Sequence, residues 1–394
     1  MIYIVITSIL LFYAVYMLIN VIASLFYIAP TYKLSNEIKH SVLIFYPAYK
    51  AEEHVVKNIR YMKKQIKNFN AKIYVLSQDS DINIDDQLKD EAHYFDSKSF
   101  AALTGNSYHY ALEYAVNRIA EYSSKQVNEF DSVLIMDPDN TMTAESVNRL
   151  IKGRLKGADV ALAKRTSINE DGSISLFDGL SERINDYMLR RAKQVVGLMP
   201  ELSGSGMMLE KELFTKAVLK LDKKAPGMDK QLLINMMFER KSLNIIFDEE
   251  AVVFDEKTTE SASFNRQRLR WFGNQYYNAK KFGFKLITSG RLALVDYAIA
   301  LWRPPRSFQL IGSIILLPID LVLFYFNHIP APILAISTFM LGLSMLLFLQ
   351  NEGMLLHTLK RIVPMAKTSI ANGFTGLKSL KSDNEGSFIH TRKK

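Results

Sequence analysis

Two aspartates one residue apart follow an apolar run in the middle of this chain. The run is SVLIM at 132–136, and Asp137, Pro138 and Asp139 come directly after it. Carboxylates at this spacing on a loop can face one cation, and Mg²⁺ or Mn²⁺ takes carboxylate oxygens together with substrate phosphates. Asp and Pro also favour plain solvated turns. The pair predicts a metal site, but is a weak indication alone.

A third carboxylate and a polar helix face follow further along. Asp229 opens a predicted helix over 229–240, where an acidic side chain also suits the helix dipole. Residues 266–271 read RQRLRW, so Gln267, Arg270 and Trp271 share one helix face. The fork of an arginine matches phosphate oxygens, and an indole ring offers a flat apolar surface for a sugar. A surface helix with one buried tryptophan is the plainer interpretation of each residue taken singly.

Taken in this order, the motifs resemble the signature of family 2 inverting glycosyltransferases, which runs D, DxD, (E/T)D, QxxRW. The likeness rests on Asp137-Pro138-Asp139, Asp229 and QRLRW at 267–271, and it covers residues 40–285. The membrane-bound branch of that family includes cellulose, chitin and hyaluronan synthases and ceramide glucosyltransferase. Further strings similar to the family are PAYKAEE at 47–53, SGSGMML at 203–209, FDEKT at 254–258 and FIHTRK at 388–393.

The resemblance implies a role for each matching residue. Asp229 would be the general base, and Asp137 and Asp139 would hold Mg²⁺ or Mn²⁺ on the diphosphate. The residues implied to bind the nucleotide sugar are Pro47, Tyr49, Glu52, Asp79, Asp137 and Arg270. Those implied to meet the acceptor or the diphosphate are Gln267, Arg268, Arg270, Trp271, Gly204, Ser205 and Gly206.

The chain departs from the family pattern in three places. The acidic residue that usually ends the second strand falls in the string Ser77-Gln78-Asp79-Ser80-Asp81, where Asp79 is the match. A Gly-Lys string is expected near residue 106, where this chain reads Thr104-Gly105-Asn106-Ser107. The acidic residue that usually precedes the base is replaced by Met228. The missing lysine bears on the diphosphate contact or on the identity of the nucleotide.

The elements that must position these residues alternate between strand-like and helical segments. Such alternation predicts an α/β fold with a mostly parallel sheet covered by helices on both faces. The resemblance implies that this sheet is GT-A-like. Ligands bind beyond the carboxyl ends of such strands, which here means after Tyr46, Ser77 and Met136. The predicted strands are 41–47, 72–77, 132–136 and 159–165, and the predicted helices are 52–67, 108–123 and 144–156.

Apolar segments near both ends predict a membrane protein. Residues 2–30 carry no charge and are long enough to span a bilayer, and residues 308–326 and 332–349 form a predicted hairpin of two further spans. Residues 292–302 are apolar but short, so we expect them to lie along the interface. The predicted division is 1–30, a transmembrane helix; 31–285, the glycosyltransferase domain; 286–306, interfacial; 307–350, the hairpin; and 351–394, an amphipathic basic tail.

The lysines and arginines that flank the spans predict the orientation. Basic residues concentrate on the cytoplasmic side of membrane proteins, so the central domain and the tail are expected in the cytoplasm, at an inner or plasma membrane. Asp320 lies inside the second predicted span. It either lies near a transport path or pairs with a neighbouring helix. The flanking basic residues are Lys33, Lys39, Arg303, Arg306, Lys360 and Arg361.

Composition narrows the remaining classes. The chain has 394 residues, 48% of them hydrophobic, a net charge of +9 and no cysteine. Disulfide frameworks, thiolate zinc sites and cysteine nucleophiles are therefore excluded. The positive charge suits an anionic membrane surface, and no nucleic-acid-binding motif accompanies it, so we expect no nucleic-acid partner.

The sequence thus predicts a hexosyltransferase-type enzyme that moves a sugar from a nucleotide diphosphate, in the first instance a UDP-sugar, to a growing polysaccharide. Transfer of one sugar to a lipid acceptor is the alternative. A catalytically silent membrane-anchored binding protein is the third interpretation, from a different class. Expected partners are the nucleotide sugar, the acceptor and membrane lipids. Three spans are few for a polymer channel, so a second copy or an accessory protein could complete one.

Overall fold

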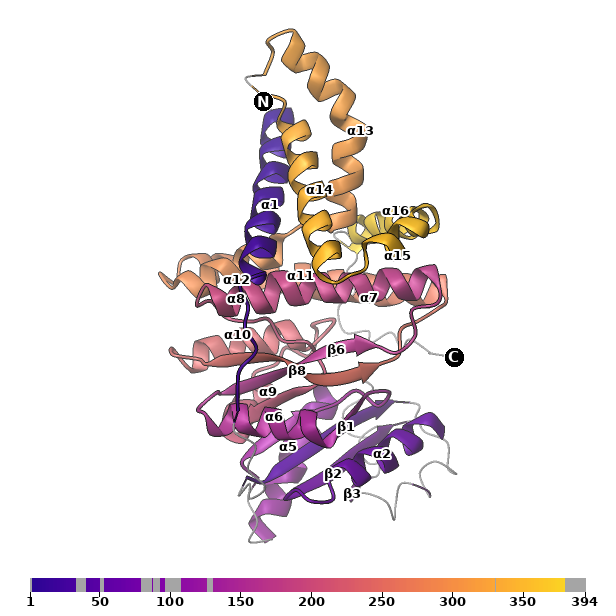
Figure 1. Ribbon diagram of the computed structural model, residues 1–394. Coiled ribbons are helices and arrows are strands. Elements are labelled where there is room, and N and C mark those ends of the chain that lie inside the picture. The colour runs from indigo at the N-terminus through magenta and orange to yellow at the C-terminus, as the bar shows by residue number, and fades with distance from the viewer. Residues whose placement is uncertain are drawn as a thin grey trace.

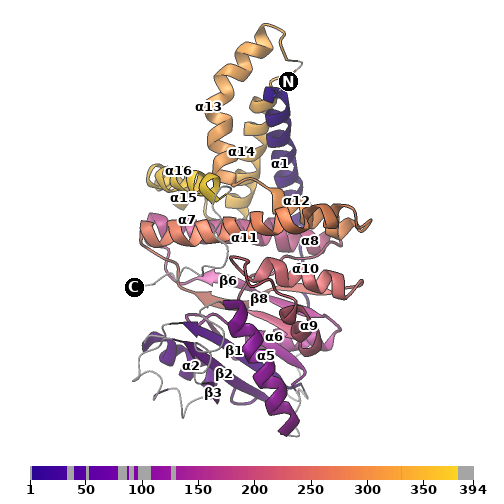
Figure 2. The ribbon, with the colours of Figure 1, turned by 180° about the vertical axis from the view of Figure 1, so that it is seen from behind.

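The computed structural model describes residues 2–32, 40–49, 53–78, 87, 93–95, 108–125, 130–329 and 331–379. Figure 1 shows an α/β domain built on one sheet and a bundle of three long helices above it, with a layer of crosswise helices between them. The same three levels appear from behind in Figure 2. The crosswise layer therefore joins the sheet to the bundle.

One eight-stranded sheet forms the α/β domain, with the order β3-β2-β1-β4-β7-β6-β8-β5. Four of its pairings are parallel, and the antiparallel ones join β4 to β7, β7 to β6 and β8 to β5. The predicted α/β class is confirmed, with a mixed sheet. The strands are β1 Val42–Tyr49, β2 Ala71–Gln78, β3 His93–Phe95, β4 Ser132–Ile135, β5 Thr141–Met142, β6 Val160–Ser167, β7 Met207–Glu210 and β8 Ile245–Asp255.

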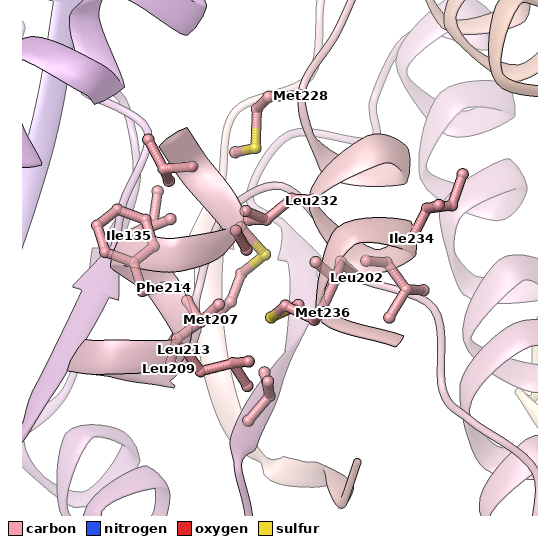
Figure 3. Packing of buried hydrophobic residues seen from close by; sticks show 14 of the residues in the cluster. Ile135, Leu202, Met207, Leu209, Leu213, Phe214, Met228, Leu232, Ile234 and Met236 are labelled. Carbon is pink, nitrogen blue, oxygen red and sulfur yellow. The ribbon is translucent and has the colours of Figure 1, made fainter. Parts of the chain in front are cut away.

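Both faces of the sheet are buried, and the side chains of β1 show why. Leu43 and Phe45 pack into one core, whereas Val42, Ile44 and Tyr46 pack into the core on the opposite face. This alternation follows from the two-residue period of a strand, and burial on both faces explains the continuous apolar run in the sequence. Figure 3 shows part of the first core, where Met207 and Leu209 of β7 meet Phe214, Leu232 and Met236.

Helices cover the two faces as the βα alternation predicts. The first core contains residues of α5, α9, α10, α11 and α12, and the second contains residues of α2 and α6. The helices of the α/β domain are α2 Glu53–Gln65, α5 Tyr108–Lys125, α6 Ala144–Leu155, α9 Lys211–Leu219 and α10 Asp229–Glu239.

The crosswise layer was only partly predicted. Its segment 173–195 had no prediction, and in the structure it is an almost continuous helix interrupted by the π-helical turn Tyr187–Arg191. The predicted interfacial segment 292–302 is α12, which packs beside α11. The layer contains α7 Ser173–Asp186, α8 Ala192–Val195, α11 Ser261–Ile287, α12 Leu292–Trp302, α15 Leu355–Lys360 and α16 Ile362–Ser379.

Three of the described helices are long and apolar enough to cross a membrane. They are α1 Ile2–Ser24, α13 Arg306–Tyr325 and α14 Ile333–Asn351, at the positions expected from the sequence. The first is shorter than the predicted 2–30, because the chain then runs down the side of the α/β domain. There the Tyr27 hydroxyl donates to the Phe247 carbonyl, and the Pro30 carbonyl accepts from Arg149.

Asp320 has a structural role in the bundle. Its carboxylate accepts hydrogen bonds from the Tyr3 hydroxyl at 2.9 Å and from the backbone N–H groups of Leu334 and Ala335 at 2.9 and 3.3 Å. Those two amides belong to the first turn of α14, whose N–H groups have no partner within the helix. Of the two interpretations offered by the sequence, pairing with neighbouring helices is the one that these contacts support.

Candidate active site

A cavity of about 510 Å³ extends from the carboxyl ends of β1 and β4 toward the crosswise layer. This is the edge at which the α/β fold predicts ligand binding. Most of the residues selected from the sequence line this one cavity: Pro47, Tyr49, Asp137, Asp139, Gly204, Asp229, Gln267, Arg268, Arg270 and Trp271. The structure therefore brings together motifs that are more than 200 residues apart in the chain, from Pro47 to Trp271.

The loop that carries the paired aspartates is braced from several sides. The backbone N–H of Asp137 donates to the Ser205 hydroxyl at 2.9 Å. Asn140 is fully buried, and its side-chain amide donates to Asp139 at 3.2 Å and to Asp255 at 3.1 Å. These contacts hold the loop in one conformation while both carboxylates face the cavity.

The donor set fits a metal that is shared with a substrate. Among the described residues, no group of three or more acidic, histidine or cysteine side chains is gathered as a complete protein site. Two carboxylates on one loop suit Mg²⁺ or Mn²⁺, which keep waters and substrate phosphates in their remaining positions. The Arg165 guanidinium lies 3.9 Å from the Asp137 carboxylate and is paired more closely with Asp255, at 2.7 Å.

Asp229 is the first residue of α10 and is held by a residue of another helix. Its Oδ1 accepts a hydrogen bond of 2.7 Å from the Asn274 side-chain amide of α11. The Asn274 side-chain oxygen in turn accepts from Asn278 at 2.9 Å, one turn further along. A chain of amides thus fixes the direction of this carboxylate, whose side chain is partly exposed in the cavity.

The QRLRW segment lies on α11, and four of its residues line the cavity: the three that share the predicted helix face, Gln267, Arg270 and Trp271, and also Arg268. Arg270 interacts electrostatically with both Asp137 and Asp229. Burial lowers the pKa of its guanidinium, and these two carboxylates oppose that shift. An arginine stays protonated under all these influences. Arg270 therefore places a positive charge near both Asp137 and Asp229.

Arg268 differs from its neighbours in the motif because it is buried against the crosswise layer. It donates to Asp178 of α7, and its guanidinium lies 4.6 Å from the centre of the Trp271 ring. A cation at this distance from an indole face is attracted by the ring. The two contacts fix the orientation of Trp271 at the wall of the cavity.

A network of buried charges lies behind the loop of Asp137 and Asp139. Arg165 binds Asp255 at 2.7 Å and Glu182 at 3.3 Å, and Lys257 contacts the same two carboxylates. Burial alone would raise the pKa of Glu182, but Arg165 and Lys257 lower it, so the carboxylate stays ionised. Asp255 and Lys257 belong to the FDEKT string, and in the structure the charged side chains of that string take part in this network.

Some of the residues selected from the sequence lie elsewhere. Glu52 and Asp79 fall outside the described residues, as does the terminal string 388–393. Ser205 and Gly206 do not line the cavity: the Ser205 hydroxyl accepts from the backbone N–H of Asp137, and Gly206 forms backbone hydrogen bonds with Ile135 and Ala163.

Sequence reasoning missed several residues that line the cavity. Asn274 carried a usable signal, because it continues the helix face of Gln267, Arg270 and Trp271 at the next turn. The others carried none, because long-range contacts bring them to the site. They are Tyr108, Arg165, Glu182, Asn185 and Glu201.

The comparisons with known proteins agree with this geometry. A model of the family described as glycosyl transferase family group 2 matches residues 132–349, more than half of the chain. No curated protein matches the chain. A mannosyltransferase from Pyrobaculum calidifontis, in complex with GDP-Man and Mn²⁺, has a TM-score of 0.52 at 11% identity and covers 94% of this chain and 95% of its own. At that identity the likeness establishes a shared GT-A fold.

Two further solved structures are similar over a smaller part of the chain. Mannosyl-3-phosphoglycerate synthase from Rubrobacter xylanophilus has a TM-score of 0.42 at 12% identity, over 66% of this chain and 78% of that one. S. aureus TarS 1-349 in complex with UDP-GlcNAc has a TM-score of 0.40 at 13% identity, over 64% of this chain and 68% of that one.

Proposed function

Because this chain belongs to glycosyl transferase family group 2 and is a glycosyltransferase, we propose that it moves a sugar from a nucleotide diphosphate to an acceptor at the membrane, with inversion at the anomeric carbon. The observation that carries the proposal is the shared cavity. Asp137, Asp139, Asp229, Arg270 and Trp271 all line it. They supply the metal ligands, the base, the cation and the ring that such a transfer needs.

In this mechanism the acceptor hydroxyl attacks the anomeric carbon directly while the bond to the nucleoside diphosphate breaks. Asp229 accepts the proton of that hydroxyl as the new glycosidic bond forms, and Asn274 keeps its carboxylate in the required direction. Arg270 stabilises the negative charge that grows on the leaving diphosphate. A Mg²⁺ or Mn²⁺ held by Asp137 and Asp139 would neutralise the same charge.

The resemblance to polysaccharide synthases favours a growing polysaccharide as acceptor, and the shape of the cavity supports the lipid alternative. The cavity continues from Trp271 to Leu310 of α13 and Leu341 of α14, which are apolar residues of the membrane bundle. A sugar chain is polar and gains little from an apolar lining, whereas the hydrocarbon of a lipid is stabilised by burial against it. A silent binding protein is disfavoured, because Asp137, Asp139 and Asp229 are all present and face the cavity.

The test of the proposal is sugar transfer by the purified full-length protein in lipid nanodiscs. A panel of labelled nucleotide sugars is supplied with a membrane lipid extract, with Mg²⁺, with Mn²⁺ or with chelator. We expect transfer from one or a few of the donors, loss in chelator and recovery when metal is restored. Product analysis then separates a polymer from a lipid that carries one sugar.

A pair of variants tests the metal ligands in the same assay. Asp139→Ala removes one of the paired carboxylates and should abolish both transfer and metal-dependent binding of nucleoside diphosphate. Asp171→Ala is the matched control, because Asp171 is exposed and lies outside the cavity. Full activity of Asp139→Ala, or of the wild type in chelator, would refute this metal site.

A further inference from the structure

The cavity has a second region beyond the catalytic residues. Past Trp271 it is lined by three arginines, Arg268, Arg303 and Arg306, and then by apolar side chains of the membrane bundle. Arg303 and Arg306 lie between the end of α12 and the start of α13, and Figures 1 and 2 show α13 rising from the crosswise helices. Arg306 begins α13, the helix that also contributes the apolar Leu310 to the lining, so positive charge and apolar surface adjoin in this region.

Arg306 is the cation in this region that lacks a counter-charge. Its guanidinium donates to the Asn185 side-chain oxygen at 2.8 Å and to the Ser181 carbonyl at 3.1 Å, and it touches the Met188 sulfur. All three partners are neutral. Among the residues that the structure describes, no carboxylate lies within ion-pair distance of it. These contacts leave two of the five N–H groups of the arginine for another partner.

The carboxylates nearest to Arg306 are already paired with other cations. Arg268 is paired with Asp178, and Arg303 lies 3.6 Å from Glu201, which Lys230 also binds. Burial alone would raise the pKa of Glu201, but Lys230 and Arg303 lower it to about 2. Arg306 lies beside the like charges of Arg268 and Arg303, and Glu201, which is already paired, is the acidic group that opposes them. The arrangement therefore favours an anion from outside the chain.

The apolar pocket begins directly beside this anion site. Leu310 lies one turn after Arg306 on α13 and lines the same cavity. Met17 of α1 and Leu341 and Met345 of α14 complete that wall. A ligand with its anionic group at Arg306 would thus have hydrocarbon-sized, apolar space on the membrane side and the catalytic residues on the other.

We propose that the acceptor is an anionic amphipathic lipid, whose phosphate or similar group lies at Arg306 and whose hydrocarbon chain lies among Met17, Leu310, Leu341 and Met345. The role as acceptor rests on the proposed function; the lipid site itself does not. A neutral lipid would leave Arg306 without a counter-charge, and a free anion would leave the apolar wall empty. Only a molecule that carries both groups matches both halves of the region.

The direct test is photo-crosslinking in nanodiscs made of phosphatidylcholine, which carries no net charge. The probe is dodecyl phosphate with a photoreactive group at the end of its chain, and the comparison probe is the corresponding alcohol. We expect the phosphate probe to label peptides that contain Met17, Leu341 or Met345, and the alcohol to label them at least about tenfold less. Unlabelled dodecyl phosphate should compete, whereas inorganic phosphate at the same concentration should not.

Two charge-removing variants sharpen the test. Arg306→Gln should reduce this labelling at least about tenfold, because a charge-assisted hydrogen bond is lost. Lys360→Gln removes the same charge at an exposed position of the crosswise layer, outside the cavity, and should label like the wild type. Equal labelling of Arg306→Gln would overturn the proposal. So would equal labelling by the alcohol, or competition by inorganic phosphate as strong as by dodecyl phosphate.

Two controls keep the outcome decisive. If Arg306→Gln does not fold, comparing the peptides that the two probes label on the wild-type protein still tests the proposed site. Label confined to membrane-facing residues such as Phe339 would contradict that site. Nucleotide-sugar turnover is measured on the same samples. Turnover without Arg306-dependent labelling overturns this inference alone, whereas Arg306-dependent labelling without any turnover overturns the proposed function and leaves the lipid site standing.

Discussion

At the scale of single residues, the identity of the base depends on which carboxylate is accessible to an acceptor. Asp229 has one hydrogen-bond donor, Asn274, and lines the cavity. The other carboxylates on nearby strands are occupied: Asp248 binds Arg149 at 2.8 Å, and Asp255 binds Arg165 at 2.7 Å. A carboxylate held in such an ion pair is a poor proton acceptor, because the arginine stabilises its charged form.

Asn274 is predicted to act as a positioning residue for Asp229. Asn274→Ala removes the 2.7 Å bond, and we expect the turnover number to fall about tenfold while nucleotide-sugar affinity stays within a few-fold. Asn274→Asp puts a second negative charge beside the base, which disfavours its charged form, so the pH–rate profile should move to higher pH.

The matched control is Asn265→Asp, which adds the same charge to α11 at a position outside the cavity. A pH–rate profile of Asn274→Asp that is identical to that of Asn265→Asp would show that Asn274 has only a structural role.

The residues that form the site differ in how far the sequence could predict them. The paired aspartates, Asp229 and the QRLRW face could be selected, because each depends on local spacing within a loop or a helix. Arg165 and Arg306 could not, because their roles arise from contacts with Asp255 and Asn185, 90 and 121 residues away in the chain. Local spacing carries no information about such pairs.

At the scale of elements, the short strand β7 connects the two halves of the sheet. It pairs antiparallel with β4 on one side and with β6 on the other. The residue before it, Gly206, has a φ of 68°. Its carbonyl accepts a hydrogen bond from the Ala163 N–H, and its own N–H donates to the Ile135 carbonyl. Its neighbour Ser205 braces the backbone of Asp137. This turn therefore sets both the strand register and the position of the loop that carries Asp137 and Asp139.

Gly206→Ala is predicted to destabilise the protein by about 2–5 kcal/mol, from backbone strain and overpacking together. The new methyl group would lie 2.2 Å from the Val253 side chain, in a conformation that favours glycine. Gly157→Ala is the control, because Gly157 has a φ of 91° but nothing within 4 Å of the added carbon.

Thermal unfolding of the two variants in detergent separates these contributions. The midpoint of Gly206→Ala should fall well below that of Gly157→Ala. Equal midpoints would contradict the tight packing against Val253.

The parallel half of the sheet could be predicted from sequence, because its buried strands are continuous apolar runs such as 41–47 and 132–136. Strands β7 and β8, which pair on the other side of the sheet, escaped prediction for a physical reason. β7 has four residues and follows a glycine-rich turn, and β8 mixes acidic with apolar residues because one part of it binds Arg149 and Arg165. Propensity and periodicity are weak guides where ion pairs replace apolar packing.

At the scale of the whole molecule, the arrangement of the bundle predicts how the chain is oriented in the membrane. α1 starts at the end of the bundle remote from the sheet, where Tyr3 meets Asp320, and α16 lies in the crosswise layer (Figure 1). The basic residues Arg303, Arg306, Lys360 and Arg361 all lie on the side of that layer. We therefore predict the amino terminus outside and the α/β domain in the cytoplasm.

Reporter fusions at both ends of the chain test this orientation. A reporter that is active only outside the cytoplasm should work at the amino terminus and fail at the carboxyl terminus. Cytoplasmic activity at the amino terminus would reverse the topology and place the catalytic cavity on the side without nucleotide sugars.

The account as a whole depends on Asp229 as the base for sugar transfer, and Asp229→Asn tests this most directly. The amide keeps the shape of the side chain and its contact with Asn274, and it removes the basicity. We predict nucleotide-sugar affinity within a few-fold of the wild type and transfer reduced by about 10²–10⁴-fold, the usual contribution of a general base. Substantial transfer by a folded Asp229→Asn protein would contradict the account.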